Sequence, residues 1–238
     1  MSSASPTGAT SDPTSDAIVE AVAGLRGGAK RRATADPLRA WAPYYAGYSL
    51  EFAEAVLQAA SLKKGSVVLD PWNGSGTTTL AAAKNGLRSL GVDLNPFAVL
   101  VARARHVGAL DARGARGLVG EISMGEPISA RTNDDPLRAW LSASEVAEVR
   151  RIQDQVLTKL ASPEGHALRV DDARFPPHAA FLLLALVRAA RSRVRAKEVS
   201  NPTVFRGSPP AWRPGAAKRL ALAWQRLATQ MGDDLAAR

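Results

Sequence analysis

Several features are absent from this 238-residue chain, and each absence excludes a class of protein. There is no cysteine, which excludes disulfides and thiolate metal sites, and the three histidines are too scattered to suggest another kind of metal centre. No apolar run reaches the roughly 18 residues that a membrane span needs. The N-terminus lacks the basic-then-apolar pattern of a secretion signal. We therefore expect a cytoplasmic protein with neither a metal site nor a membrane contact.

Acidic residues are outnumbered by basic ones, 22 to 31, which gives a formal net charge of +9 at pH 7. A surplus of this size attracts polyanions, of which nucleic acid is the commonest. Arginine- and alanine-rich chains also acquire basic surfaces through their composition alone. The charge therefore permits DNA as a partner without requiring it.

The composition divides the chain into three regions. Residues 1–35 are rich in Ser, Thr, Pro and Gly and contain a basic cluster at 30–32, which predicts a disordered, basic tail, although residues 18–25 have helical spacing. Residues 36–125 alternate strand and helix patterns, which predicts an α/β fold with a doubly wound half-sheet. Residues 126–238 predict an α-helical C-terminal extension with helices at 136–141, 144–160, 178–197 and 216–236.

The helix expected over residues 178–197 is apolar all round in its first half and basic in its second. Arg188, Arg191 and Arg195 share one face of the basic half. Such a stripe suits contact with nucleic-acid phosphates, and it equally suits a solvated helix end whose charge complements the macrodipole. The sequence leaves both interpretations open.

The most informative stretch is residues 67–79, Val-Val-Leu-Asp-Pro-Trp-Asn-Gly-Ser-Gly-Thr-Thr-Thr. The apolar run ends at Asp70, Pro71 ends the strand, and a glycine turn leads into a helix predicted over residues 77–85. A second apolar segment, residues 89–92, ends at Asp93, about 23 residues after the first acid, which is the spacing of one βαβ unit. The two acids are therefore expected at the same edge of a parallel sheet.

This unit suits a ligand that resembles a nucleotide. The helix that opens after the glycine turn presents free N–H groups, and an acid that ends the second strand can accept both hydroxyls of a ribose. No lysine follows Gly76, so a P-loop is excluded, and Thr79 stands where a dinucleotide fingerprint has its third glycine. S-adenosylmethionine remains, because Asp70 suits its cationic amine better than a pyrophosphate.

Residues 70–78, DPWNGSGTT, resemble the DPFxGSGTT cofactor motif of DNA amino-methyltransferases, which methylate N6 of adenine or N4 of cytosine. Residues 91–96, GVDLNP, are similar to the second motif of that family, and residues 43–49, PYYAGYS, to the segment ahead of its cofactor motif. The resemblance spans about residues 40–106 and implies a Rossmann-like methyltransferase fold that binds S-adenosylmethionine. It implies cofactor contacts from Tyr45, Tyr48, Asp70, Pro71, Asn73, Gly74, Ser75, Gly76, Thr77, Asp93, Leu94 and Asn95.

The catalytic motif of this family is [DNS]PP[YFW], which is distinct from the cofactor motifs above. Its residues accept hydrogen bonds from the target amine and stack an aromatic ring on a flipped base. The candidate here is Ser208-Pro209-Pro210-Ala211-Trp212, with Ala211 where the family has an aromatic residue. The residues before it make a poor buried strand, whereas the family places the motif at the end of an apolar strand. Ser208, Pro209 and Pro210 are therefore catalytic candidates, but we expect a second polypeptide to supply the motif.

The resemblance thus implies the cofactor-binding half of a split DNA methyltransferase, whose active site forms across a subunit interface. A truncated enzyme is the other explanation for the motif's absence. The alternatives in function are a non-catalytic subunit that binds S-adenosylmethionine or DNA within a larger modification or defence complex, and a component of an RNA methyltransferase.

Overall fold

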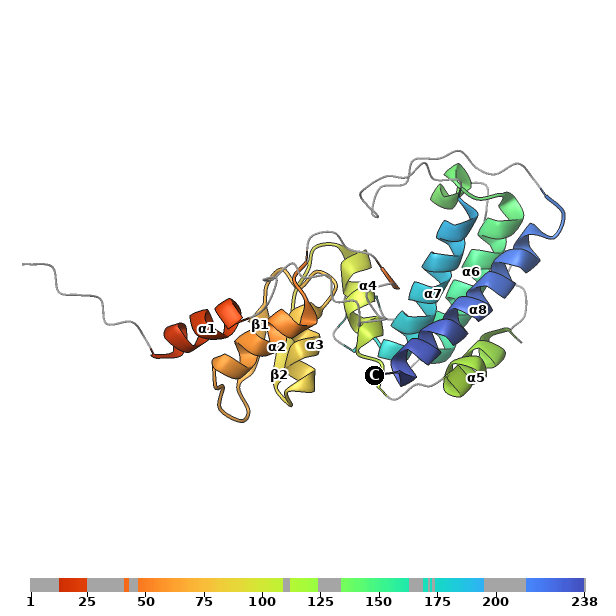
Figure 1. Ribbon diagram of the computed structural model, residues 1–238. Helices are drawn as coiled ribbons and strands as arrows, with labels where there is room; N and C mark the ends of the chain where they lie inside the picture. The colour runs from red at the N-terminus through yellow and green to blue at the C-terminus, as the bar shows by residue number, and fades with distance from the viewer. Residues whose placement is uncertain are drawn as a thin grey trace, which may run out of the picture.

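The computed structural model describes residues 13–24, 41–42, 47–108, 112–123, 134–162, 169–170, 172, 174–194 and 213–237. Figure 1 shows a small α/β unit at one end of the molecule and a helical bundle at the other, with one helix, α4, between them. The elements are α1 (Pro13–Gly24), α2 (Leu50–Ala59), β1 (Val67–Asp70), α3 (Thr77–Lys84), β2 (Arg88–Gly91), α4 (Pro96–Arg105), α5 (Ala112–Ser123), η2 (Pro136–Ala139), α6 (Ala143–Leu160), α7 (Pro177–Arg193) and α8 (Ala216–Ala236).

The α/β unit is a single βαβ crossover. Strands β1 and β2 are parallel, in a register that pairs Leu69 with Leu90, and α3 connects them. Helix α2 packs on α3 through a small core that includes Leu50, Ala53 and Leu80. In the described part of the chain the sheet has these two strands, so the fold is mixed α/β but mostly helical. This arrangement matches part of the Rossmann-like region that the sequence predicts.

One face of the sheet is open. Side chains alternate along a strand, and in β1 Val67 and Leu69 are exposed whereas Val68 and Asp70 are partly buried. The four aliphatic residues of the outer face keep 54% (Val67), 62% (Leu69), 56% (Leu90) and 47% (Val92) of their surface exposed. Parallel sheets are normally covered on both faces, so this exposure is unusual.

The helical bundle consists of α4 to α8 around a central α7, which packs against α4, α6 and α8. The apolar first half of α7 is buried as predicted, from Ala179 to Leu182 and at Leu184, Ala185 and Leu186. Trp224 of α8 donates its indole N–H to the carbonyl of Leu182 at 3.1 Å. Trp41, which precedes α2, joins the same core. Its ring packs edge-on against Phe181, and its indole N–H donates to Asp234 at 2.8 Å.

Most predicted elements are present, with three differences. Helix α7 ends at Arg193, before residue 197, and residues 136–139 form a 3-10 turn that stops short of residue 141. Helix α5 was not predicted, because its glycines at 114, 117 and 120 weaken the helical signal. Its buried residues, Ala115, Val119 and Ile122, nevertheless follow the spacing of an amphipathic helix.

The N-terminal region contains more structure than the composition indicates. Helix α1 occupies residues 13–24 and packs against α2, overlapping the segment whose helical spacing begins at residue 18. The basic cluster at 30–32 lies outside the described residues. None of the described helices is both long and apolar enough to cross a bilayer.

The arginines of α7 contact the protein itself. Arg193 forms an ion pair with Glu145 of α6 at 2.9 Å, and that carboxylate is 1% exposed. Arg188 is partly buried, and its positive charge interacts with Asp234 of α8. Arg195 lies outside the described residues. Of the predicted stripe, Arg188 therefore takes part in the packing between helices, as does the neighbouring Arg193.

Candidate functional site

The two acids of the βαβ unit lie at the same edge of the sheet. Asp70 pairs with Gly91 in the ladder, and the contact continues beyond it, because the N–H of Val92 donates to the carbonyl of Asp70 at 2.9 Å. The N–H of Asn73 then donates to the carbonyl of Val92, also at 2.9 Å. These bonds fasten the loop after β1 onto the end of β2.

Asp93 bridges two loops with its carboxylate. Its Oδ2 accepts from the N–H of Gly74 at 2.8 Å, and its Oδ1 accepts from the N–H of Asn95 at 2.8 Å. A carboxylate offers about four acceptor positions, so Asp93 can hold both loops and still accept two hydroxyls. The residues present at this edge thus fit a ribose.

The glycine turn has a packing role that the sequence did not reveal. Gly74 and Gly76 have positive φ angles of 52° and 83°. A Cβ built on Gly76 would lie 2.7 Å from the Cβ of Ala102 and 2.9 Å from its Cα, because α4 passes directly beneath the loop. Gly76 therefore allows the start of α3 to approach α4, in addition to any ligand that the turn admits.

Most acceptor positions of the Asp70 carboxylate are filled by hydrogen bonds within the protein. Its Oδ1 accepts from the N–H of Trp72 at 3.0 Å. Its Oδ2 accepts from the Thr78 hydroxyl at 2.5 Å and from the Tyr48 phenol at 3.3 Å, and Thr78 and Tyr48 also bond to each other. Burial raises the pKa of Tyr48, the hydrogen bond with Thr78 opposes this rise, and the charge of Asp70 adds to it. Tyr48 is thus held in its neutral form over the loop.

A second polar network, centred on Thr79, supports the glycine turn. Thr79 donates to the carbonyl of Gly76 at 3.1 Å, lies 3.3 Å from Asn73 Oδ1, and contacts Nε2 of His106 at 3.2 Å. The amide of Asn73 lies directly over Gly91, where a Cβ would overlap it. The threonine at the third-glycine position is therefore a structural residue of the loop.

Arg105 is a site residue that the sequence analysis missed. It ends α4, a position where an arginine is expected to be solvated, yet it is only 5% exposed. Its Nη1 donates to the carbonyl of Ser75 at 2.9 Å and to the Ser75 hydroxyl at 3.3 Å. Helical periodicity cannot reveal this contact, because the acceptor lies 30 residues earlier in the chain.

The remaining predicted residues fall into two groups. Leu94 is 98% exposed beside Asp93, Pro71 is exposed, Thr77 begins α3, and Asn95 caps α4 by accepting from the N–H of Phe97 at 3.0 Å. Tyr45 lies outside the described residues, as do the catalytic candidates Ser208, Pro209 and Pro210. Among the described residues, no cluster of histidine and carboxylate side chains could hold a metal ion.

The glycine turn, the paired acids and the parallel crossover define a partial Rossmann-like unit of the kind that binds nucleotide-like cofactors. Residues 25–104 match the model of the DNA methylase family, the N6/N4 methyltransferases, whose members use S-adenosylmethionine. The chain is also similar to the type II methyltransferase M.BsoBI of Geobacillus stearothermophilus, with 40% identity over 57 residues. That alignment covers 24% of this chain and 11% of the other enzyme. No solved structure matches the chain.

Proposed function

We propose that this chain binds S-adenosylmethionine and takes part in the methylation of an exocyclic amine, N6 of adenine or N4 of cytosine, in DNA. The observation that carries the proposal is the position of Asp93. It lies at the carboxyl edge of the parallel pair, bonded to the glycine turn on one side and to the cap of α4 on the other. A ribose bound there would face the start of α3.

Each part of the site has a distinct role in this proposal. Asp93 accepts the ribose hydroxyls, and Leu94, which is almost fully exposed, covers one face of the adenine. Gly74, Ser75 and Gly76 form the turn, which Arg105 holds through Ser75. Asp70 attracts the ammonium of the methionine end chiefly by its charge, since most of its acceptor positions are filled by the Trp72 N–H, Thr78 and Tyr48.

When bound, the cofactor would supply an electrophilic methyl group, carried on its sulfonium, for transfer to the amine. The amine is a poor nucleophile, because its lone pair is delocalised into the base. Acceptors that hold the nitrogen in line are therefore needed. In the family these are the [DNS]PP[YFW] residues, which we propose are supplied by a partner chain.

The open face of the sheet supports such a partner. Val67, Leu69, Leu90 and Val92 form a continuous aliphatic surface next to the cofactor edge. Burying this surface under a partner would complete the two-sided cover that a parallel pair requires. The interface and the active site would then adjoin each other.

Cofactor binding is tested best at Leu94, because an almost fully exposed side chain has little part in folding. We expect Leu94→Glu to weaken S-adenosylmethionine binding about tenfold or more in calorimetric titration, since it removes apolar contact with the adenine. Leu222→Glu on α8 is the matched control, being 53% exposed and remote from the site. Equal affinity in the two variants would contradict the assignment of the adenine position.

The partner is tested by methyl transfer. We expect labelled S-adenosylmethionine to methylate DNA only when this chain is mixed with a polypeptide that carries an apolar strand ending in [DNS]PP[YFW], encoded by an adjacent reading frame. Leu69→Lys should abolish transfer by the mixture and leave cofactor binding intact. Transfer by this chain alone would overturn the split arrangement and return attention to Ser208.

A non-catalytic subunit is the second candidate, favoured by the net charge of +9. Several described arginines, however, are engaged within the protein: Arg103 with the carbonyls of Asp172 and Phe175, Arg150 with Asp135, and Arg193 with Glu145. These guanidinium groups are therefore committed to contacts within the protein, although the ion pairs leave the net charge of +9 unchanged. Tight, salt-sensitive DNA binding with no transfer in any mixture would favour this candidate.

A further inference from the structure

Two large apolar side chains at the cofactor edge are unusually exposed. Trp72 is 83% and Leu94 is 98% exposed, which makes them the most exposed large apolar residues in the described part of the chain. One follows β1 and the other follows β2, so both lie beyond the carboxyl ends of the parallel pair. Leu94 covers the adenine in the proposed function, whereas Trp72 has no role in it. Tryptophan is on average highly buried, so its exposure here calls for an explanation.

The backbone on both sides of Trp72 is held by hydrogen bonds. The N–H of Trp72 donates to Oδ1 of Asp70 at 3.0 Å. The N–H of the next residue, Asn73, donates to the carbonyl of Val92 at 2.9 Å. An aromatic side chain on an anchored backbone loses little conformational entropy when it binds a ligand. Trp72 is therefore a preorganised contact surface.

The place of Trp72 in the loop relates it to the substrate of the proposed function, on which this inference rests. There Asp70 attracts the methionine end of the cofactor, next to which the transferable methyl group lies. Atoms poised to react are about 3–3.5 Å apart, so a target base must come to the same edge of the sheet as the loop of residues 70–76. Trp72 is the exposed aromatic residue of this loop.

The indole ring suits a nucleobase. Every base has a flat π face that stacks on aromatic side chains, and this contact tolerates any sequence. The family's catalytic motif also provides a ring for the extruded base, but the candidate motif in this chain has Ala211 in that place. A stacking ring from the cofactor loop would therefore supply a contact that the rest of this sequence lacks.

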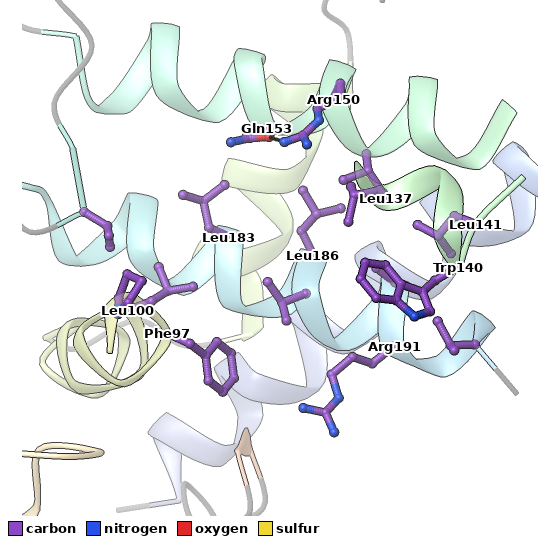
Figure 2. Close-up of a pocket in the computed structure, with 16 residues that line it drawn as sticks. Phe97, Leu100, Leu137, Trp140, Leu141, Arg150, Gln153, Leu183, Leu186 and Arg191 are labelled. Atoms are coloured by element: carbon purple, nitrogen blue, oxygen red, sulfur yellow. Dashed lines mark hydrogen bonds between the residues drawn. The ribbon is translucent and has the colours of Figure 1, made fainter. Parts of the chain in front are cut away.

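An internal cavity offers another place for a base, but its chemistry is unsuitable. The cavity has a volume of about 410 Å³ and lies between α4, η2, α6 and α7. Figure 2 shows Phe97 and Trp140 on opposite sides of it, with Leu186 between them, and the rest of its lining is mostly aliphatic. Most donors and acceptors of a base would be left unpaired there. A base stacked on Trp72 would keep its edges accessible to water and to a partner.

We propose that Trp72 is the stacking surface on which this chain receives the extruded DNA base, so that it acts in substrate recognition and not in cofactor binding. The ring covers one face of the base and leaves the exocyclic amine free for the acceptors that the partner supplies. Stacking uses the face of the base, so Trp72 contributes affinity for unpaired bases without selecting between adenine and cytosine.

Single-stranded oligodeoxyadenylate of about 12 nucleotides is the probe, and an abasic strand with the same phosphates is its counterpart. In fluorescence anisotropy with the full-length chain, we expect the adenylate to bind at least about tenfold more tightly than the abasic strand. Trp72→Leu should remove this difference, Trp72→Phe should keep part of it, and Leu222→Ala, 53% exposed on α8, should keep all of it. Equal binding of the two strands by the wild type, or an unchanged difference in Trp72→Leu, would overturn the proposal.

Calorimetric titration with S-adenosylmethionine separates this inference from the proposed function. We expect Trp72→Leu to keep the cofactor affinity of the wild type. If the variant loses cofactor affinity but binds adenylate normally, Trp72 belongs to the cofactor site and the inference is wrong. If the wild type does not bind the cofactor while Trp72→Leu still loses adenylate, the proposed function fails and the stacking surface is supported. If Trp72→Leu prevents association with the partner polypeptide and leaves adenylate binding intact, Trp72 is an interface residue and the inference is overturned.

Discussion

Replacing Gly76 by alanine tests the contact between the glycine turn and α4. The new Cβ would lie 2.7 Å from the Cβ of Ala102, much closer than atoms can pack, and the residue would keep a left-handed backbone at φ 83°. The left-handed conformation costs a residue with a Cβ about 1–2 kcal/mol, and overpacking costs about 1–3 kcal/mol more. We expect Gly76→Ala to lower the free energy of unfolding by about 2–5 kcal/mol.

Gly86 provides a matched control for the backbone contribution. It has a φ of 67°, and a Cβ built on it meets nothing within 4 Å. Gly86→Ala should therefore cost only the conformational part, about 1–2 kcal/mol. The difference between the two variants measures the steric contact, chiefly with Ala102 and to a smaller extent with the Thr79 hydroxyl.

Urea unfolding followed by far-UV circular dichroism measures both variants, and hydrogen exchange localises the effect. The N–H of Leu80 donates to the carbonyl of Gly76 at 3.0 Å, so its exchange should accelerate in Gly76→Ala. Adding Ala102→Gly should recover part of the loss, even though glycine costs about 1 kcal/mol in a helix interior. If Gly76→Ala and Gly86→Ala agree within about 0.5 kcal/mol, the close approach of α4 is refuted.

Three further predictions concern the supports of the fold and the site. Arg105→Met should weaken S-adenosylmethionine binding several-fold by releasing Ser75, and an unchanged dissociation constant would contradict its positioning role. Trp41→Phe should keep the ring contact with Phe181 but lose the bond to Asp234, costing about 1.5–3 kcal/mol in urea unfolding; no loss would show that this bond adds nothing. Burial raises the pKa of the Glu145 carboxyl, but hydrogen bonds from Ser142 and Arg193 outweigh this effect and hold the pKa below 4.5. The pair of Glu145 and Arg193 therefore stabilises the fold above pH 4.5, and this stabilisation is lost as the pH falls through the lowered pKa. Arg193→Met should therefore cost about 3 kcal/mol at pH 7, with the difference from wild type narrowing in acid; a constant difference from pH 7 to 3 would argue against this linkage.

The sequence predicted the local structure around the candidate site most accurately where the information is local. The crossover from Asp70 to Asp93 is encoded by two apolar runs, a glycine turn and a helix, all within one short segment. The adjacency of the two acids then follows from parallel pairing alone. The helices with clear periodicity, α6 and α8, were predicted close to their observed ends.

Features that depend on distant contacts were not predictable in this way. Arg105 looks like a surface residue until Ser75 is placed beside it, and Trp41 finds its acceptor on α8. Helix α5 carries glycines that lower its intrinsic propensity, and packing against α8 overrides that preference. The cofactor contacts and the division into regions remain predictions.

Helix α4 belongs to both halves of the molecule. Ala102 and Arg105 shape the glycine turn, while Leu100 and Ala104 lie in the core that α7 organises. A fragment that ends before residue 96 would lose Ala102, which packs against Gly76, and Arg105, which bonds to Ser75. A fragment that ends just after residue 105 would expose the apolar residues with which α4 packs against α7. Grafting or expressing this βαβ unit therefore requires carrying the bundle with it, so the two halves must be exchanged as one piece in any chimera.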